Sequence, residues 1–176
     1  KTIVLGDDKQ VLHTISEGKP YGEMFMAEWS KDEQGRRLVD AKGVPILTAK
    51  TSYAGNFNPD YLLGVSNAFS YSNFSLSFLI DYRQGGIVVG GIQAVMDATG
   101  NSKQSHSGRE NGIVLDAYTA DGGKNTQNIS AETYWQSLGN RTPVKDFYAY
   151  SATNLRLREV VLGFRIPDRF INKSGF

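Results

Sequence analysis

Cysteine is absent from this 176-residue chain, which excludes a disulfide framework, a thiolate metal site and a cysteine nucleophile. Neither sign of charge dominates, since 19 basic and 18 acidic residues give a net charge of +1, and no bulk field favours nucleic acid as a partner. No apolar run reaches the roughly 18 residues of a membrane-spanning helix. This last absence leaves open a transmembrane β-barrel, whose strands do not produce such runs.

Residues that could carry catalysis are scarce. The two imidazoles, His13 and His106, are far apart in sequence, and nothing around them has the pattern of a nucleophile and its base. The glycine pair before Lys124 lacks the spacing of a phosphate loop. Four acids that could ligate calcium lack the spacing of a calcium loop: Asp7, Asp8, Asp116 and Asp121. We therefore expect no enzyme, no metal and no cofactor.

Residues 60–83, DYLLGVSNAFSYSNFSLSFLIDYR, carry the clearest strand pattern of the chain. They predict a hairpin of strands 60–71 and 74–84, with a turn at Ser72-Asn73 in which Asn73 accepts the positive φ of a tight hairpin. Serines, Asp81 and Arg83 share one face. The opposite face is apolar and includes Leu63, Val65, Phe69, Phe74, Leu76, Phe78 and Ile80. A water-soluble core or lipid could cover this apolar face, and the hairpin alone does not decide between them.

Two further strands are expected, at 2–16 and at 152–166. A probable turn, Gly6-Asp7-Asp8, interrupts the first of them. In the second, the apolar alternation changes parity midway, which indicates either a bulge near Glu159 or a change in the buried face. All regular elements of any length are thus strands, and the fold class is all-β.

The segments between these strands, 17–59 and 85–151, are long, rich in glycine and irregular, with one weak helical pattern at 130–138. Structureless loops of more than about 15 residues are uncommon in compact domains. An outer-membrane barrel, in contrast, alternates short periplasmic turns with long external loops. The loops therefore favour part of a large transmembrane β-barrel, with 17–59 and 85–151 as its external loops.

Aromatic side chains in these long segments are the remaining candidates for binding. Trp29, Tyr134 and Trp135 could stack on sugar rings or on a partner protein. Packing of the loops would also explain each of them and is slightly favoured for any single one, and both interpretations stay open.

Four blocks carry a resemblance to a known family. They are ISEGKPYGEMF (Ile15–Phe25), GNFNPDYLLGVSNAFSYSNFSLSFLIDYRQGG (Gly55–Gly86), DGGKNTQNISAETYW (Asp121–Trp135) and YAYSATNLRLREVVLGFRIPDRFI (Tyr148–Ile171). In this order and spacing, the sequence resembles the SusC/RagA family of TonB-dependent outer-membrane transporters of Bacteroidota. The resemblance covers nearly the whole chain and places it late in such a barrel.

The resemblance implies import of an oligosaccharide or peptide across the outer membrane, with a SusD-like surface lipoprotein capping the barrel and TonB supplying energy. It implies contact with outer-membrane lipid, no nucleic acid, no catalysis and a further turn around Pro167–Gly175. The plug domain and the final strands would lie outside this chain. Both ends of the sequence look cut, so we expect a piece of a larger protein rather than a complete domain.

A soluble all-β carbohydrate-binding module is the alternative. It would place Phe69, Phe74, Leu76 and Phe78 in a core against a second sheet. The shortage of strands for that second sheet argues against it.

Overall fold

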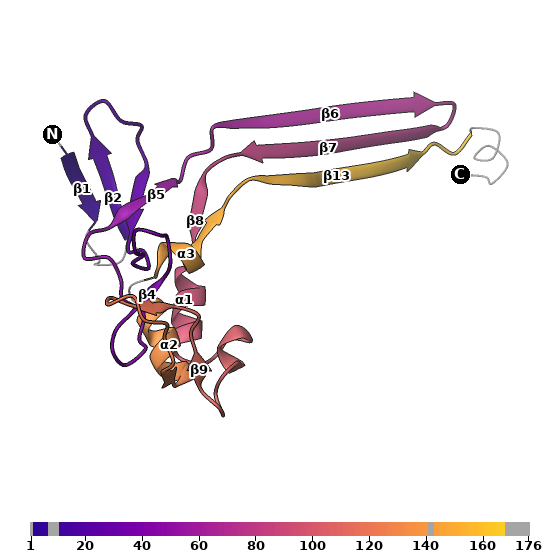
Figure 1. The fold of residues 1–176 in the computed structure, drawn as a ribbon. Helices are drawn as coiled ribbons and strands as arrows, with labels where there is room; N and C mark the ends of the chain where they lie inside the picture. The colour runs from indigo at the N-terminus through magenta and orange to yellow at the C-terminus, as the bar shows by residue number, and fades with distance from the viewer. Residues whose placement is uncertain (1, 7–10, 141–142, 168–176) are drawn as a thin grey trace. The chain divides into compact units, whose positions relative to one another are not determined.

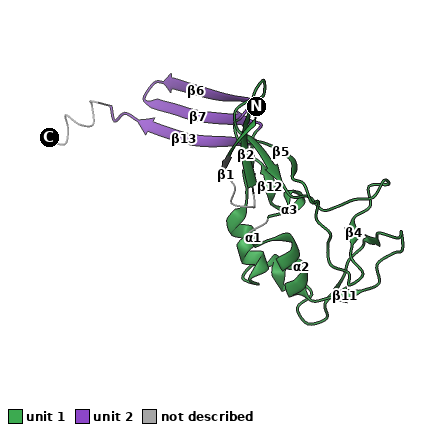
Figure 2. Cartoon of the chain, turned by 90° about the vertical axis from the view of Figure 1, so that its left-hand side faces the viewer, with its two compact units in different colours: residues 1–58, 86–151 green, residues 59–85, 152–176 purple. Residues whose placement is uncertain are grey.

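The computed structural model describes residues 2–6, 11–140 and 143–167, which form mostly antiparallel strands with a few short helices. Two compact units make up the chain: residues Lys1–Asn58 with Gly86–Ser151, called unit 1, and Pro59–Gly85 with Ala152–Phe176, called unit 2 (Figure 2). In the described ranges, no helix is long and apolar enough to cross a membrane.

Unit 2 is a three-stranded antiparallel sheet in the order β13-β7-β6 (Figure 1). Its strands are β6 (Tyr61–Tyr71), β7 (Phe74–Gln84) and β13 (Asn154–Phe164), with bounds within two residues of the predicted ranges 60–71, 74–84 and 152–166. β-branched and aromatic residues at alternate positions fit a pleated surface, which is why these segments are extended.

The β6–β7 turn differs from the prediction in one respect. The positive φ, 53°, belongs to Ser72 and not to Asn73. A two-residue hairpin turn can match the strand twist with a positive φ at its first central residue alone, so the second residue, Asn73, needs no positive φ. Asn73 instead uses its carbonyl oxygen, which accepts a hydrogen bond from the Arg165 backbone N–H at 2.7 Å.

Unit 1 contains a four-stranded antiparallel sheet in the order β1-β2-β3-β5. The strands are β1 (Thr2–Gly6), β2 (Val11–Ser16), β3 (Glu23–Met26) and β5 (Ser52–Asn56). The segment 2–16, expected as a strand interrupted by a turn, forms two strands that pair with each other, since Thr2 lies opposite Ser16. Residues Asp7 and Asp8 of the predicted turn lie outside the described residues, as does the second turn expected at 167–175 beyond Pro167.

The rest of unit 1 is built from short elements. β4 (Leu38–Val39) pairs in parallel with β10 (Tyr118–Thr119). Two further pairs are antiparallel: β9 (Ile113–Val114) with β11 (Asn128–Ile129), and β8 (Ile87–Val89) with β12 (Ala149–Ser151). The helices are α1 (Gly91–Ala98), η1 (Gln104–His106), α2 (Ala131–Leu138) and α3 (Lys145–Tyr148). Ser130 caps α2, since its hydroxyl accepts from the Thr133 N–H at 3.1 Å, which confirms the helix expected at 130–138.

Both long segments contribute to one hydrophobic core. Its buried members are Trp29 and Val39 from the first segment and Ala94, Leu115, Ala117, Ile129, Leu138, Val144 and Tyr148 from the second. A smaller buried cluster, Val11, Met24 and Met26, comes from β2 and β3 of the four-stranded sheet itself. The segments 17–59 and 85–151, expected to be long and largely irregular, thus fold together around contacts between residues far apart in sequence.

Candidate functional site

The sheet of unit 2 has one continuous apolar face. The register aligns Val65 with Ile80 and Phe69 with Leu76 across β6 and β7, and Leu76 with Leu162 across β7 and β13. All seven residues expected on this face lie on it: Leu63, Val65, Phe69, Phe74, Leu76, Phe78 and Ile80. β13 adds Leu155, Leu157, Val160, Leu162 and Phe164. Asn67, opposite Phe78, is the polar exception in mid-strand.

This apolar face is largely exposed. Leu162 is 74% exposed, Phe69 55% and Val160 56%. Among the described strands, none covers it as a second sheet would in a soluble sandwich. An exposed apolar patch of this extent marks an interaction surface rather than a free surface in water.

Strand length and aromatic placement suit a bilayer. Each strand has eleven residues, and a transmembrane strand needs about 9–11. Aromatic rings lie at both ends of the apolar face: Tyr61 and Tyr82 at one, with ring centroids 6.0 Å apart, and Phe74 and Phe164 at the other, 4.8 Å apart. Aromatic rings gather at the two interfaces of outer-membrane barrels.

A β-bulge keeps the apolar face continuous along β13. Leu157 pairs with Ile80, and Glu159, rather than Arg158, pairs with Leu79. The extra residue resets the alternation, so Val160 and Leu162 return to the apolar side while Glu159 goes to the polar side. Of the two explanations open for the parity change, the bulge near Glu159 is confirmed.

The three aromatic residues expected to contact a ligand belong to unit 1. Trp29 is 2% exposed, and its indole N–H donates to the Leu38 carbonyl at 2.7 Å. Its ring packs against the Arg37 guanidinium, 4.7 Å from the ring centre. Tyr134 is half-buried against the same core, with its ring 5.0 Å from that of Trp135. The loop-packing interpretation thus describes the observed contacts of Trp29 and Tyr134.

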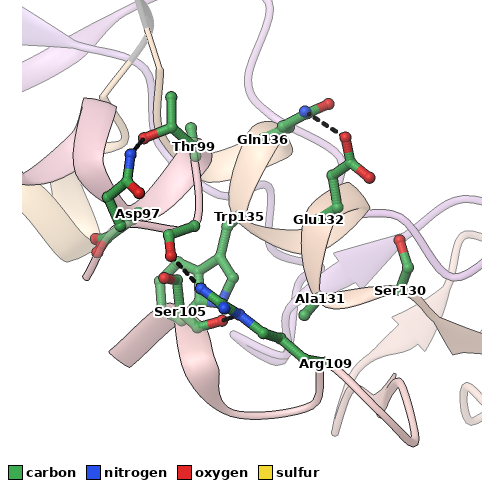
Figure 3. Close-up of a pocket in the computed structure, with 12 residues that line it drawn as sticks. Asp97, Thr99, Ser105, Arg109, Ser130, Ala131, Glu132, Trp135 and Gln136 are labelled. Atoms are coloured by element: carbon green, nitrogen blue, oxygen red, sulfur yellow. Dashed lines mark hydrogen bonds between the residues drawn. The ribbon is translucent and has the colours of Figure 1, made fainter. Parts of the chain in front are cut away.

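Trp135 is different, because it lines a cavity of about 790 Å³ formed by α1, η1 and α2 (Figure 3). Trp135 is 8% exposed, and its indole nitrogen finds no hydrogen-bond acceptor in the part of the chain that the structure describes. The Arg109 guanidinium, held by the carbonyls of Ser105 and Gly100, also lines this cavity. Sequence reasoning singled out Trp135 but missed Arg109, whose polar glycine-rich segment carries no motif.

The lining of this cavity includes a buried carboxylate, Asp97, which is 1% exposed. The Tyr148 hydroxyl donates to it at 2.9 Å, and the Gln93 amide donates at 2.8 Å. Burial and this hydrogen bond raise the pKa of Tyr148, which keeps the hydroxyl protonated as the donor. Asp97 is therefore a structural anchor between α1 and α3.

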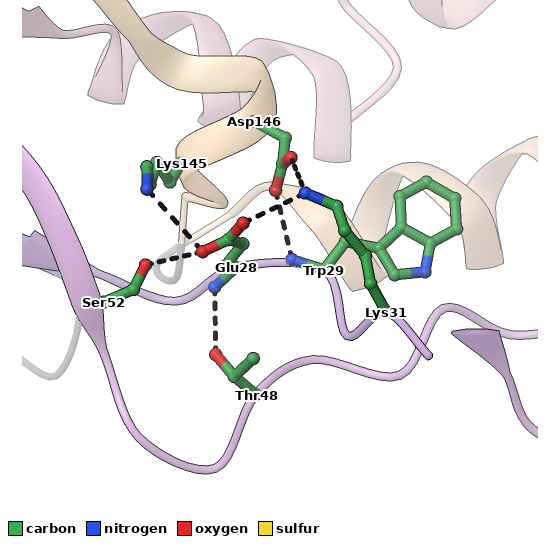
Figure 4. A network of polar contacts seen from close by, with 7 residues as sticks. All are labelled: Glu28, Trp29, Lys31, Thr48, Ser52, Lys145 and Asp146. Atoms are coloured by element: carbon green, nitrogen blue, oxygen red, sulfur yellow. Dashed lines mark hydrogen bonds and ion pairs between the residues drawn. The ribbon is translucent and has the colours of Figure 1, made fainter. Parts of the chain in front are cut away.

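A second polar network joins the two halves of unit 1 (Figure 4). The Lys31 ammonium lies 3.0 Å from Glu28 and 3.4 Å from Asp146, and Lys145 lies 3.6 Å from Glu28. The hydrogen bond from the Ser52 hydroxyl, followed by the one from Lys31, lowers the pKa of Glu28. Alternating charges paired in this way indicate a structural cross-link and not a catalytic site.

The other candidates for chemistry do not form a site. His13 lies in β2 with its ring 6.3 Å from that of Phe57, and His106 lies exposed in η1. Asp116 pairs with Lys124 at 3.2 Å. Within the described residues, no three histidine or acidic side chains gather as metal ligands would.

Comparison with known proteins gives one informative relative. The chain is 29% identical over 146 residues to a TonB-dependent receptor of Formosa agariphila, and the match covers 83% of this chain. It covers only 13% of that receptor's length. No family model matches the chain. The chain is thus similar to a short part of a TonB-dependent receptor, in agreement with the open sheet and its exposed apolar face.

Proposed function

We propose that the chain is a segment of an outer-membrane active transporter of the SusC/RagA type. Unit 2 would form three strands of its barrel wall, with the apolar face toward lipid and the polar face toward the lumen. The observation that carries this proposal is the sheet itself: three eleven-residue strands with one exposed apolar face and one polar face. Similarity to a TonB-dependent receptor supports it.

The open edges of the sheet support a larger barrel. β6 and β13 each have one neighbour among the described strands, so each leaves a row of backbone N–H and C=O groups unpaired. Lipid does not tolerate unpaired edges, since no water is there to satisfy them. Further strands of the same barrel would pair with both edges.

Connectivity supports the assignment of sides. The two-residue turn between β6 and β7 lies at one end of the sheet, and all three connections to unit 1 leave from the other end. Outer-membrane barrels have short turns on the periplasmic side and long loops outside. Unit 1 would accordingly be external, where a SusD-like lipoprotein could cap the barrel.

In this proposal the transporter imports oligosaccharides or peptides, TonB supplies the energy through parts outside this chain, and no catalysis occurs. The cavity that Trp135 lines is the place in unit 1 for contact with solute or cap, and Tyr134 supports Trp135 there through the packing of their rings. Trp29, a core residue, would support that region from within.

Cysteine labelling of the full-length protein in isolated outer membranes tests the proposal. The chain has no cysteine, and Leu76 and Ser77 are neighbours on opposite faces of β7. We expect Leu76→Cys to react with a lipid-soluble maleimide only and Ser77→Cys to react with a sulfonated, water-soluble one. In intact cells, Lys42→Cys in unit 1 should react with the sulfonated reagent. Equal reaction of Leu76→Cys with the water-soluble reagent would refute the barrel wall and favour the soluble carbohydrate-binding module.

A further inference from the structure

Three arginines meet on the polar face of unit 2. Arg83 comes from β7, and Arg156 and Arg158 come from β13. They line a cavity of about 290 Å³ together with Leu62, Asp81 and Asn154. Arg156 lies directly opposite Asp81 in the register, and Arg83 lies opposite Asn154 one polar-face position further along. Residues separated by 71 or more positions in the chain are thereby brought to one spot.

The bulge in β13 contributes to this arrangement. Arg158 is the extra residue of the bulge and has no directly opposite partner on β7. Its guanidinium reaches back to the Asp81 carboxylate and forms an ion pair with it. Bulges commonly re-aim a side chain at barrel rims and functional sites. Asp81 therefore pairs with Arg158 at the cavity and would compete with a solute anion for this guanidinium.

Arginines outnumber carboxylates among the residues that line the cavity. Three guanidinium groups line it against one carboxylate, Asp81. Glu159 lies on the same face but does not line the cavity. The Arg158 side chain is 57% exposed, so a solute can reach it from water. Guanidinium groups bind carboxylate and sulfate oxygens in a planar, two-pronged geometry that suits such a site.

We propose that this arginine cluster binds an acidic oligosaccharide through its carboxylate or sulfate groups. The inference rests on the proposed function, because it takes the polar face as the wall of the transport path, where rings of charged side chains select ions of opposite sign. Beyond the cluster, small hydroxyl side chains cover much of this face: Ser66, Ser70, Ser75 and Ser77. Such a surface offers hydrogen bonds to sugar hydroxyls, and Leu62, Leu79 and Val161 are the larger apolar side chains among the described residues of this face.

Binding of defined probes to the detergent-solubilised full-length protein tests the assignment. The probes are hexagalacturonate for sugar carboxylate, a κ-carrageenan hexasaccharide for sulfate, maltohexaose as the neutral control and hexaglutamate as the acidic peptide. We expect one of the acidic sugars to bind more tightly than the other three probes and to weaken as salt is raised. The better of the two acidic sugars then identifies the group that is recognised.

Single substitutions distinguish binding at the arginine cluster from a general effect of positive charge. Arg83→Gln, Arg156→Gln and Arg158→Gln should each weaken acidic-sugar binding by about tenfold, the loss of one charge-assisted hydrogen bond. Arg165→Gln, just beyond the opposite end of β13, should leave it unchanged. Asp81→Asn removes the competing carboxylate and should tighten binding, a gain that damage to folding would not produce.

Several results would overturn the inference: no acidic sugar binding above that of maltohexaose, affinity unaffected by the three glutamine variants, or hexaglutamate as the tightest ligand. These results can be distinguished from those that would refute the proposed function. That failure would show in the labelling of Leu76→Cys and Ser77→Cys, which does not depend on the solute.

Discussion

Two adjacent valines of β13 offer a direct test of what covers each face of the sheet. Val160 pairs with Phe78 on the apolar face and Val161 pairs with Ser77 on the polar face. They have similar exposure, 56% and 46%, and the same chemistry, so each is the control for the other. We consider Val160→Arg and Val161→Arg in the full-length protein.

The expected magnitudes follow from position. Val160 lies near the middle of the eleven-residue strand, which is the centre of the bilayer if the strand spans it. An arginine on the lipid face at the midplane costs about 2–4 kcal/mol. Val161→Arg would face the aqueous lumen, where an exposed substitution usually changes stability by less than about 0.5 kcal/mol. The difference between the two variants should thus exceed about 1.5 kcal/mol.

Reversible urea unfolding from lipid vesicles measures this difference. Phe164→Arg, at the strand end, provides a depth control, because the cost near an interface falls to about 0–1 kcal/mol. If both faces met water, Val160→Arg and Val161→Arg would have similarly small effects. Equal stability of the two variants would therefore refute the lipid-facing interpretation.

Three further predictions concern unit 1. Ser130→Ala removes the cap of α2 and should cost about 1 kcal/mol, seen as faster hydrogen exchange in that helix alone, whereas Ser130→Gly should cost only a few tenths. Leu138→Ala empties a fully buried site and should cost about 2–5 kcal/mol in chemical denaturation, against less than about 1.5 kcal/mol for Leu138→Met. Glu28 has a lowered pKa when folded, so its stabilising effect is present above the ordinary glutamate pKa and lost as pH falls through the folded value. Thermal melts should therefore show a smaller acid-induced loss of stability for Glu28→Gln than for the parent, and an equal loss would contradict this reasoning.

Local sequence patterns were sufficient to predict the strands of unit 2. Period-2 alternation in 60–71 and 74–84 gave the strands, their faces and the turn, because each side chain's face depends only on its position along an extended chain. The bulge near Glu159 was also visible in the sequence, because the alternation of apolar residues shifts by one position there. The prediction that Asn73 has the positive φ of the turn was wrong, because Ser72 has it. Both residues tolerate this backbone geometry, and the strand twist decides between them.

The fold of unit 1 could not be predicted from local sequence patterns. Val39 and Tyr148 belong to one core although over a hundred residues separate them, and β4 pairs with β10 although Leu38 and its partner Tyr118 are 80 positions apart. Two-residue strands carry too few side chains to show a period. The burial of Trp29 and the cavity position of Trp135 likewise depend on which distant segment packs against each ring.

The sequence by itself therefore determined the strands of unit 2, their apolar and polar faces and the resemblance to a transporter family. Only the tertiary structure decided that the long segments fold around a shared core, and that three arginines from two strands meet beside Asp81. The physical reason is the range of the interactions. Alternation is a property of neighbouring residues, whereas packing and charge clustering depend on strand register and on contacts closed over long stretches of chain.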